Sequence, residues 1–382
     1  MSRRGPLAAF IAFGLLWGTL AALAPALQTA AGASKGEFGL ALLFVAVGSV
    51  PAMLLTGREL DRRGTRILPW LLAGMAASAV LPGLAGSVAA LGAGLLAVGL
   101  FTGATDVAMN AAVSELEAKR GTRLMQLAHA LYSAGVLVGA LATGIARELG
   151  ADRLHILGAV SFALLAAAAL NLRQERFEPR PAGSRGLRLS RAAIPLGIAC
   201  AAAFVIEGGM ENWGAIFLER ELDAGPGASA LAPAAYGGAM MLGRLSGQWL
   251  ESRLGDTLLL AGAMTVALLG LFGAAAAPNV PAAIAAFFVG GAGISIAAPA
   301  LFGAGGRLAT PEERGSAVAT VTTLGYLGFL IGPPLVGGLA EAIGLRAAFV
   351  ALALIAAGLV VATPRLRLSG RVPGTDPGTR PV

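Results

Sequence analysis

Long apolar segments recur along the whole chain, and each is long enough to cross a bilayer as a helix. A hydrocarbon layer of about 30 Å needs about 20 apolar helical residues. Helices also satisfy their own backbone groups in lipid, and the segments lack the alternation of barrel strands. We therefore predict an all-α membrane protein with twelve transmembrane helices, at 7–28, 38–57, 67–86, 89–113, 124–147, 154–172, 192–218, 229–250, 257–277, 281–304, 315–339 and 344–363.

The composition agrees with this prediction and argues against soluble chemistry. Only 13% of the 382 residues are charged, whereas soluble proteins carry about 25%. The chain has no P-loop, and two distant His residues with the single Cys200 give neither a metal cluster nor an intrachain disulfide. We expect no enzyme activity, no metal and no cofactor. The net charge of +7 is spread over many loops, so we expect no nucleic-acid partner.

The distribution of Lys and Arg predicts the topology. With the N-terminus in the cytoplasm, 23 of the 28 basic residues fall on the cytoplasmic side, as the positive-inside rule requires. A wrongly assigned span would move the later basic residues to the opposite side and weaken this bias. We therefore predict a multi-pass protein with both termini in the cytoplasm. The other side keeps Lys35, Arg147, Arg153, Arg220 and Arg346.

A long polar stretch divides the chain into two similar halves. We predict an N-terminal six-helix bundle at 1–172, a cytoplasmic linker at 173–191, a C-terminal six-helix bundle at 192–363 and a disordered cytoplasmic tail at 364–382. "YSAGVLVGALATGIARELG", from Tyr132, matches "YLGFLIGPPLVGGLAEAIG", from Tyr326, at several positions. Two six-helix repeats around a midplane site are a common plan of secondary transporters.

The loop between the second and third segments, "GRELDRRGTR", resembles the G-x-x-x-D-R-x-G-x-R signature of the major facilitator superfamily. The resemblance implies a fold of two pseudo-symmetric six-helix bundles. It also implies that this loop acts as a latch for one conformation. The predicted latch and cytoplasmic-gate residues are Gly57, Asp61, Arg62, Gly64, Arg66, Arg244 and Arg253.

A closer resemblance covers nearly the whole chain. It is carried, in order, by "DVAMNA", "LMQLAHALYSAG", "EGGMENW", "MMLGRLSG" and "VTTLGYLGFLIGPPLVG". Together these motifs resemble bacterial inner-membrane transporters grouped near the fucose permeases. The resemblance implies roles in solute binding and proton coupling for Asp106 and Asn110. Its relatives usually carry an acid at the position of Asn212, whereas here the acid is Glu211, about 100° away around a helix.

Two pairs of polar residues lie inside predicted spans. Asp106 and Asn110, like Glu207 and Glu211, are four residues apart and share a helix face. In the superfamily, the helices that carry them line a central cavity. An ionised carboxylate in hydrocarbon costs at least about 2.5 kcal/mol, so at least one acid is expected to hold a proton. The functional interpretation is proton coupling or solute binding, and the alternative is a structural bond between helices.

The remaining candidates lie next to these pairs. Asn212 and Trp213 follow Glu211, and Trp213 is expected either to stack on a solute ring or to pack near the membrane interface. His129 and Tyr132 share the fifth segment, where a His can titrate near neutral pH or bond a neighbouring helix.

These observations favour a secondary active transporter in the bacterial inner membrane. We expect a monomer, partnered by the bilayer and a small polar solute, sugar-like or another metabolite, with the proton as coupling ion. The alternatives are a drug or metabolite exporter, an uncoupled facilitator, or a sensor that transports nothing. Four Trp and three Tyr leave few rings for sugar stacking. The acidic residues favour neutral or cationic solutes over anions.

Overall fold

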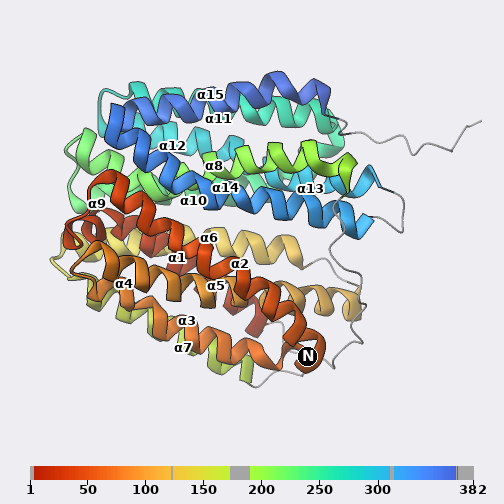
Figure 1. Ribbon diagram of the computed structural model, residues 1–382, viewed down its shortest axis with the longest axis horizontal. Coiled ribbons are helices and arrows are strands. Elements are labelled where there is room, and N and C mark those ends of the chain that lie inside the picture. Colours follow the sequence, from red (N-terminus) through yellow and green to blue (C-terminus); the bar gives the residue numbers. More distant parts are fainter. Residues whose placement is uncertain (1–3, 122–123, 173–189, 310–313, 367, 369–382) are drawn as a thin grey trace, which may run out of the picture.

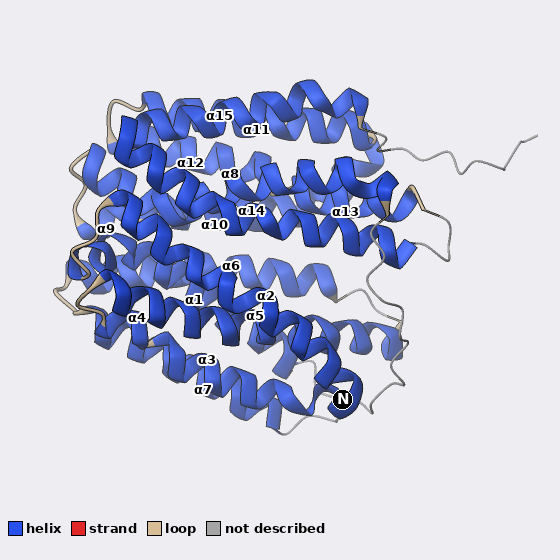
Figure 2. Cartoon of the chain, in the orientation of Figure 1, coloured by secondary structure: helices blue, strands red, loops and turns tan. Residues whose placement is uncertain are grey.

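The computed structural model describes residues 4–121, 124–172, 190–309, 314–366 and 368. Every regular element in these ranges is a helix (Figure 2). The long helices are α1 (Arg4–Ala30), α2 (Lys35–Arg63), α3 (Leu68–Ala79), α5 (Val88–Arg120), α6 (Met125–Glu148), α7 (Arg153–Leu172), α8 (Ile194–Glu221), α10 (Leu231–Leu254), α11 (Asp256–Ala276), α12 (Val280–Ile294), α13 (Ala297–Arg307), α14 (Arg314–Ile343) and α15 (Leu345–Ala362). The short elements are η1 (Gly64–Ile67), α4 (Leu81–Leu84), η2 (Arg191–Ala193), α9 (Pro226–Ser229) and η3 (Thr363–Arg365).

The helices supply twelve membrane spans, as predicted. Ten stretches of the described chain are long and apolar enough to cross a membrane. One of these, 35–84, is 50 residues long and contains two spans, α2 and α3 with α4, because the chain reverses at η1 (Figure 1). The remaining span is α10, which packs against α6 and α12. Large apolar side chains on the outer surface, such as the 75% exposed Phe162, suit contact with lipid.

One span is broken rather than continuous. The segment predicted at 281–304 forms α12, which ends at Ile294, and α13, which begins at Ala297. Pro299 lies in the first turn of α13. A proline cannot donate to the carbonyl four residues earlier and its ring clashes there, so the break at Ser295 has a local cause.

Helix ends follow signals in the local sequence. Before α2, the Ser34 hydroxyl accepts from the Glu37 backbone N–H at 3.2 Å, and the Glu37 carboxylate accepts from the Ser34 N–H at 2.9 Å. This reciprocal pair is a capping box. At the other end of a span, α5 ends at Arg120, and the φ of 62° at the next residue, Gly121, suits a residue without a Cβ.

The same packing order recurs in both groups of six spans. In the first group α1 packs on α6, α2 on α5, and α3 on α7; in the second α8 packs on α14, α10 on α12, and α11 on α15. Figure 1 shows the first group, red to yellow, beside the second, green to blue. Contacts of α6 with α10 and of α2 with α14 join the groups. The chain therefore has the expected pseudo-symmetric fold.

The predicted linker and tail are mostly outside the described ranges. Of the linker at 173–191, only residues 190 and 191 are described. Of the tail at 364–382, only 364–366 and 368 are described. The bounds of the four predicted segments therefore stay predictions.

Small residues let helices within a group approach backbone to backbone. A Cβ on Gly14 or Gly18 of α1 would collide with the carbonyl oxygens of Tyr132 and Val136 on α6. The corresponding seam of the second group has the same feature, because a Cβ on Gly328 of α14 would collide with the carbonyl of Ala201. Such contacts are typical of helix association in lipid and make each group a tightly packed unit.

Candidate functional site

A cavity of about 560 Å³ lies between the two groups of helices. Side chains from α1, α2, α5, α6, α8, α10, α11, α12, α13 and α14 line it. Its lining includes Met125, Gln126 and Leu259, which lie in the first turns of α6 and α11. We call that end of the bundle the basic end, and the opposite end the closed end. The volume suits a small organic molecule.

The helix α8 brings three of the predicted residues to this cavity. Glu207, Glu211 and Asn212 line it, and each is half-buried. Glu207 and Glu211 are one helical turn apart and interact electrostatically. The Asn212 amide donates to the Gly208 carbonyl of its own helix at 2.8 Å. Glu211 and Asn212 are adjacent in the sequence, yet both side chains lie on the cavity wall.

The helix α5 contributes a third carboxylate. Asp106 lines the cavity and is half-buried. The Asn110 amide donates to the Asp106 Oδ1 at 3.0 Å and to its backbone carbonyl at 2.9 Å. Asn110 is not among the lining residues. Its hydrogen bond therefore holds the Asp106 carboxylate without Asn110 itself lining the cavity. No ion pair involves Asp106, Glu207 or Glu211 in the described part of the chain.

The helices α6 and α10 meet at the cavity through Arg244. Its guanidinium donates to the Ser133 hydroxyl at 2.6 Å and to the His129 carbonyl at 3.4 Å. The same group lies 5.5 Å from the centre of the Tyr132 ring, which is a cation–π distance. Arg244, His129 and Tyr132 all line the cavity. Sequence reasoning placed Arg244 at a cytoplasmic gate, and the structure places it on the cavity wall, where it joins the two groups.

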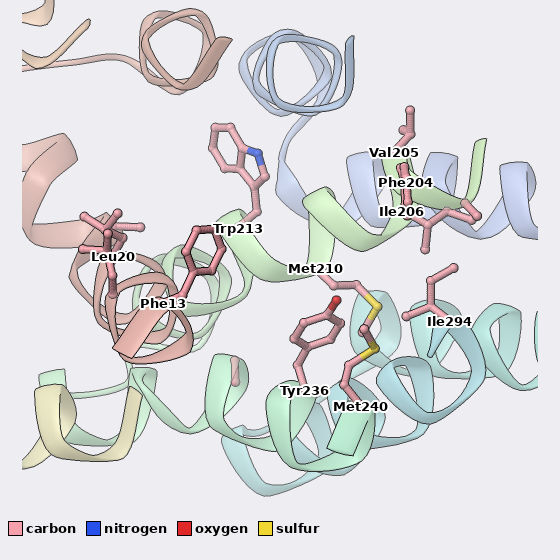
Figure 3. Packing of buried hydrophobic residues seen from close by; sticks show 14 of the residues in the cluster. Phe13, Leu20, Phe204, Val205, Ile206, Met210, Trp213, Tyr236, Met240 and Ile294 are labelled. Atoms are coloured by element: carbon pink, nitrogen blue, oxygen red, sulfur yellow. The ribbon is translucent and has the colours of Figure 1, made fainter. Parts of the chain in front are cut away.

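Trp213 is not brought to the cavity. Its side chain is 0% exposed and packs edge-on against Phe38 of α2, with the ring centres 5.8 Å apart. Figure 3 shows the indole between neighbouring helices, away from Met240 on the cavity side. Of the two predicted roles, the geometry favours packing. The indole N–H has no hydrogen-bond partner among the described residues.

The predicted latch lies apart from the cavity, where α2 meets η1. Asp61, Arg62 and Arg66 are exposed, and Glu59 pairs with Arg62 at 3.5 Å and with Arg63 at 2.8 Å. Gly57 lies in α2, Gly64 ends that helix, and Arg253 is exposed near the end of α10. The latch role is untested by this geometry.

Sequence reasoning missed a polar network at the closed end. The Arg147 guanidinium donates to the Glu219 carboxylate at 3.0 Å, to the Ser229 hydroxyl at 3.2 Å and to the Ala22 carbonyl at 2.9 Å. These bonds join α6 and α1 of the first group to α8 and α9 of the second. The signal was present in the charges flanking the spans. Their pairing depends on which helices are neighbours.

Further contacts close the same end. The Gly227 N–H donates to Glu148 at 2.9 Å, the Arg220 guanidinium donates to the Thr29 hydroxyl at 2.7 Å, and Glu221 lies 3.8 Å from both Lys35 and Arg346. Four of the five basic residues that topology assigned to one side therefore meet here. The fifth, Arg153, donates to the Gly83 carbonyl beside α4.

Sequence reasoning also underestimated the aromatic content of the cavity. Five of its eight aromatic lining residues are phenylalanines, which were not counted as candidates. The eight are Phe10, Phe13, Trp17, Tyr132, Phe204, Phe302, Tyr326 and Phe329. They come from five helices of both groups, so only the folded arrangement brings them together.

Comparison with known sequences gives a family. The family model of the Major Facilitator Superfamily matches residues 7–279 and 199–381. An uncharacterized MFS-type transporter of Yersinia pestis is 34% identical over 352 residues, which are 91% of each chain. An uncharacterized transporter of Sinorhizobium fredii is 30% identical over 370 residues, covering 95% of this chain and 98% of that one.

Comparison with solved structures agrees. A variant of the nucleoside transporter NupG superposes with a TM-score of 0.79 at 12% identity, covering 94% of this chain and 98% of that one. A bacterial homolog of the human lysosomal transporter Spinster, in an inward-facing and occupied conformation, gives 0.72 at 16% identity, covering 94% and 96%. At these identities the likeness shows the fold alone. A place near the fucose permeases stays a prediction.

Proposed function

The chain belongs to the Major Facilitator Superfamily, and from that premise we propose that it is a proton-coupled secondary transporter. It moves one small organic solute across the bacterial inner membrane by alternating access. The two six-helix groups rock about the cavity between them, as in other transporters built from repeats.

The observation that carries this proposal is the set of three carboxylates on the cavity wall. Asp106, Glu207 and Glu211 are half-buried in the cavity wall, and the described residues give none of them an ion pair. Burial disfavours the charged form of a carboxylate, and a second carboxylate nearby adds repulsion. Proton binding relieves both costs. The same oxygens can accept hydrogen bonds from a solute, so proton and solute binding are linked.

The contacts at the closed end support alternating access. The Arg147 and Arg220 bonds hold the two groups together there, while the cavity lining extends to the basic end. With the basic end in the cytoplasm, as the Lys and Arg distribution predicts, the described state faces inward. The opposite state then requires the closed-end bonds to break.

The test is solute flux in proteoliposomes with and without an imposed pH gradient. We expect an inward-acid and an inward-alkaline gradient to change the flux in opposite directions. Glu207→Gln should remove this dependence. Asp223→Asn is the matched control, because Asp223 is an exposed carboxylate just beyond α8 and its φ of 51° suits Asn. Flux that ignores the gradient would instead support an uncoupled facilitator, and absence of flux for every solute would support a sensor.

A further inference from the structure

The cavity has an aromatic cluster on each side. In the second group, Phe204 stacks on Phe329 with ring centres 4.4 Å apart and on Tyr326 at 5.9 Å. In the first group, Phe13 lies 5.9 Å from Tyr132 and 6.3 Å from Trp17. We call these the C-half cluster (Phe204, Phe302, Tyr326, Phe329) and the N-half cluster (Phe10, Phe13, Trp17, Tyr132). All eight line the cavity.

The serine and threonine hydroxyls that line the cavity donate to nearby backbone carbonyls. Ser49 donates to the Val45 carbonyl at 2.7 Å, Thr102 to the Val98 carbonyl at 2.8 Å, and Ser295 to the Ala292 carbonyl at 2.7 Å. A hydroxyl has a single proton. Toward the cavity these three hydroxyls therefore offer only lone pairs. The hydroxyls of Tyr132 and Tyr326 and the amides of Gln126 and Asn212 remain as neutral donors among the described lining residues.

The charged groups favour the same conclusion. Among the described residues, Arg244 is the one Lys or Arg in the lining, and it is held by Ser133, the His129 carbonyl and the Tyr132 ring. The three lining carboxylates have no ion pair in the described chain, and they only accept hydrogen bonds when ionised. The acids, serines and threonine of the wall thus offer negative charge and lone pairs, and the two aromatic clusters offer ring surface.

We propose that the transported solute is an organic cation: an ammonium or protonated ring nitrogen carried on an apolar body. The proposal rests on the proposed function and names the substrate class of the same site. Aromatic faces carry negative potential and attract cations, as the carboxylates do. A polyhydroxylated sugar would instead need donors that Ser49, Thr102 and Ser295 do not offer. An anion would face three acids for one occupied arginine.

The first experiment compares four probes that differ in one property each. They are phenethylamine (aromatic cation), cyclohexylethylamine (cation without an aromatic ring), phenethyl alcohol (neutral) and phenylacetate (anion). Binding to the purified full-length protein is measured as a rise in melting temperature, which follows ligand affinity. We expect both amines to bind at least about tenfold more tightly than the alcohol, with phenylacetate weakest.

Variants then test the residues. Phe329→Leu should weaken phenethylamine about three- to tenfold and cyclohexylethylamine less, because only the aromatic ring loses a stacking partner. Glu207→Gln should weaken both amines. Phe272→Leu is the matched control, since Phe272 is 41% exposed on the outer surface of α11 and is not part of the lining. Equal binding of alcohol and amine, or amine binding that ignores both cavity variants, overturns the proposal.

Flux measurements separate this inference from the proposed function. Proton-dependent transport of a hexose or a nucleoside, with no amine binding, would overturn the substrate class and leave the transporter intact. Amine binding that depends on Glu207 without any flux would support the site chemistry and overturn transport. Neither binding nor flux for any probe or solute would overturn both.

Discussion

One helix carries two pairs of glutamates with opposite surroundings. Near the middle of α8, Glu207 and Glu211 face the cavity, and the described residues give them no ion pair. At the end of the same helix, Glu219 lies 3.0 Å from Arg147, and Glu221 lies 3.8 Å from Lys35 and from Arg346. The comparison separates acids that hold the bundle closed from acids that are available to a proton or a solute.

The reason for the difference is the reach of basic side chains. Lys35, Arg147 and Arg346 come from helix ends at the membrane surface, where Lys and Arg are tolerated. The middle of a span has few cations, because each one in hydrocarbon costs several kcal/mol. Arg244, near the middle of α10, is the exception, and its bonds go to α6. Acids of one type on one helix therefore have different partners because they lie at different positions along it.

Neutralising the cavity pair should lower flux, and neutralising the closed-end pair should lower stability. This is the largest expected effect. Glu207→Gln with Glu211→Gln should lower proton-driven flux at least about a hundredfold, equivalent to about 2.7 kcal/mol. The melting temperature should stay the same or rise, since no paired charge is lost. Glu219→Gln with Glu221→Gln should keep the pH dependence and lower the melting temperature. Flux across a pH gradient and thermal unfolding of both double variants check this. An equal loss of flux in both would contradict the difference between the cavity glutamates and the closed-end glutamates.

Gly18 lets α1 approach α6 closely, near the Ala22 carbonyl that accepts from Arg147 at the closed end. A side chain at this position should push the two helices apart. Gly18 lies one turn before Ala22, and a Cβ there would collide with the Val136 carbonyl. We expect Gly18→Ala to lower the free energy of unfolding by about 1–3 kcal/mol, as overpacking does. Gly262→Ala is the control, because a Cβ at Gly262 meets nothing within 4 Å. A melting temperature unaffected by Gly18→Ala would contradict the tight seam.

Removing the Arg147 side chain should loosen the closed end. Arg147→Ala leaves Glu219 without its 3.0 Å partner, and the Arg147 side chain is only 9% exposed. We expect the closed end to open about tenfold more often, a change of about 1.4 kcal/mol. The measurement is the labelling rate of a cysteine at Thr19, which is 1% exposed, by an impermeant maleimide with Cys200 replaced by Ala. Unchanged labelling would assign the closure to other bonds.

The smallest expected effect concerns an acid outside the membrane. The backbone N–H of His155 donates to Asp152 at the start of α7 and lowers the pKa of that carboxyl below its ordinary value of 3.8. A lowered pKa means that the ionised form stabilises the fold above that value, and that this stabilisation is lost as the pH falls through the folded pKa. Asp152→Asn should therefore lower the melting temperature slightly near neutral pH, with wild type and variant converging in strong acid. Parallel curves at all pH values would refute this.

The twelve spans, the repeat of six and the grouping of basic residues could all be read from the sequence. Each depends on local properties: an apolar run must cross lipid as a helix because its backbone can be satisfied in no other way. Motifs such as "GRELDRRGTR" added the family, which the comparisons confirm. The pairing of Asp106 with Asn110 also followed from their spacing of one helical turn.

Contacts between distant segments were decided only by the tertiary structure. It placed Arg244 against Ser133 and the Tyr132 ring, buried Trp213 against Phe38, and paired the end charges across two groups of helices. It also gathered rings from five helices around three carboxylates. Hydropathy says which residues lie in the membrane. It does not say which faces of two helices meet, because that depends on close packing between side chains far apart in the chain.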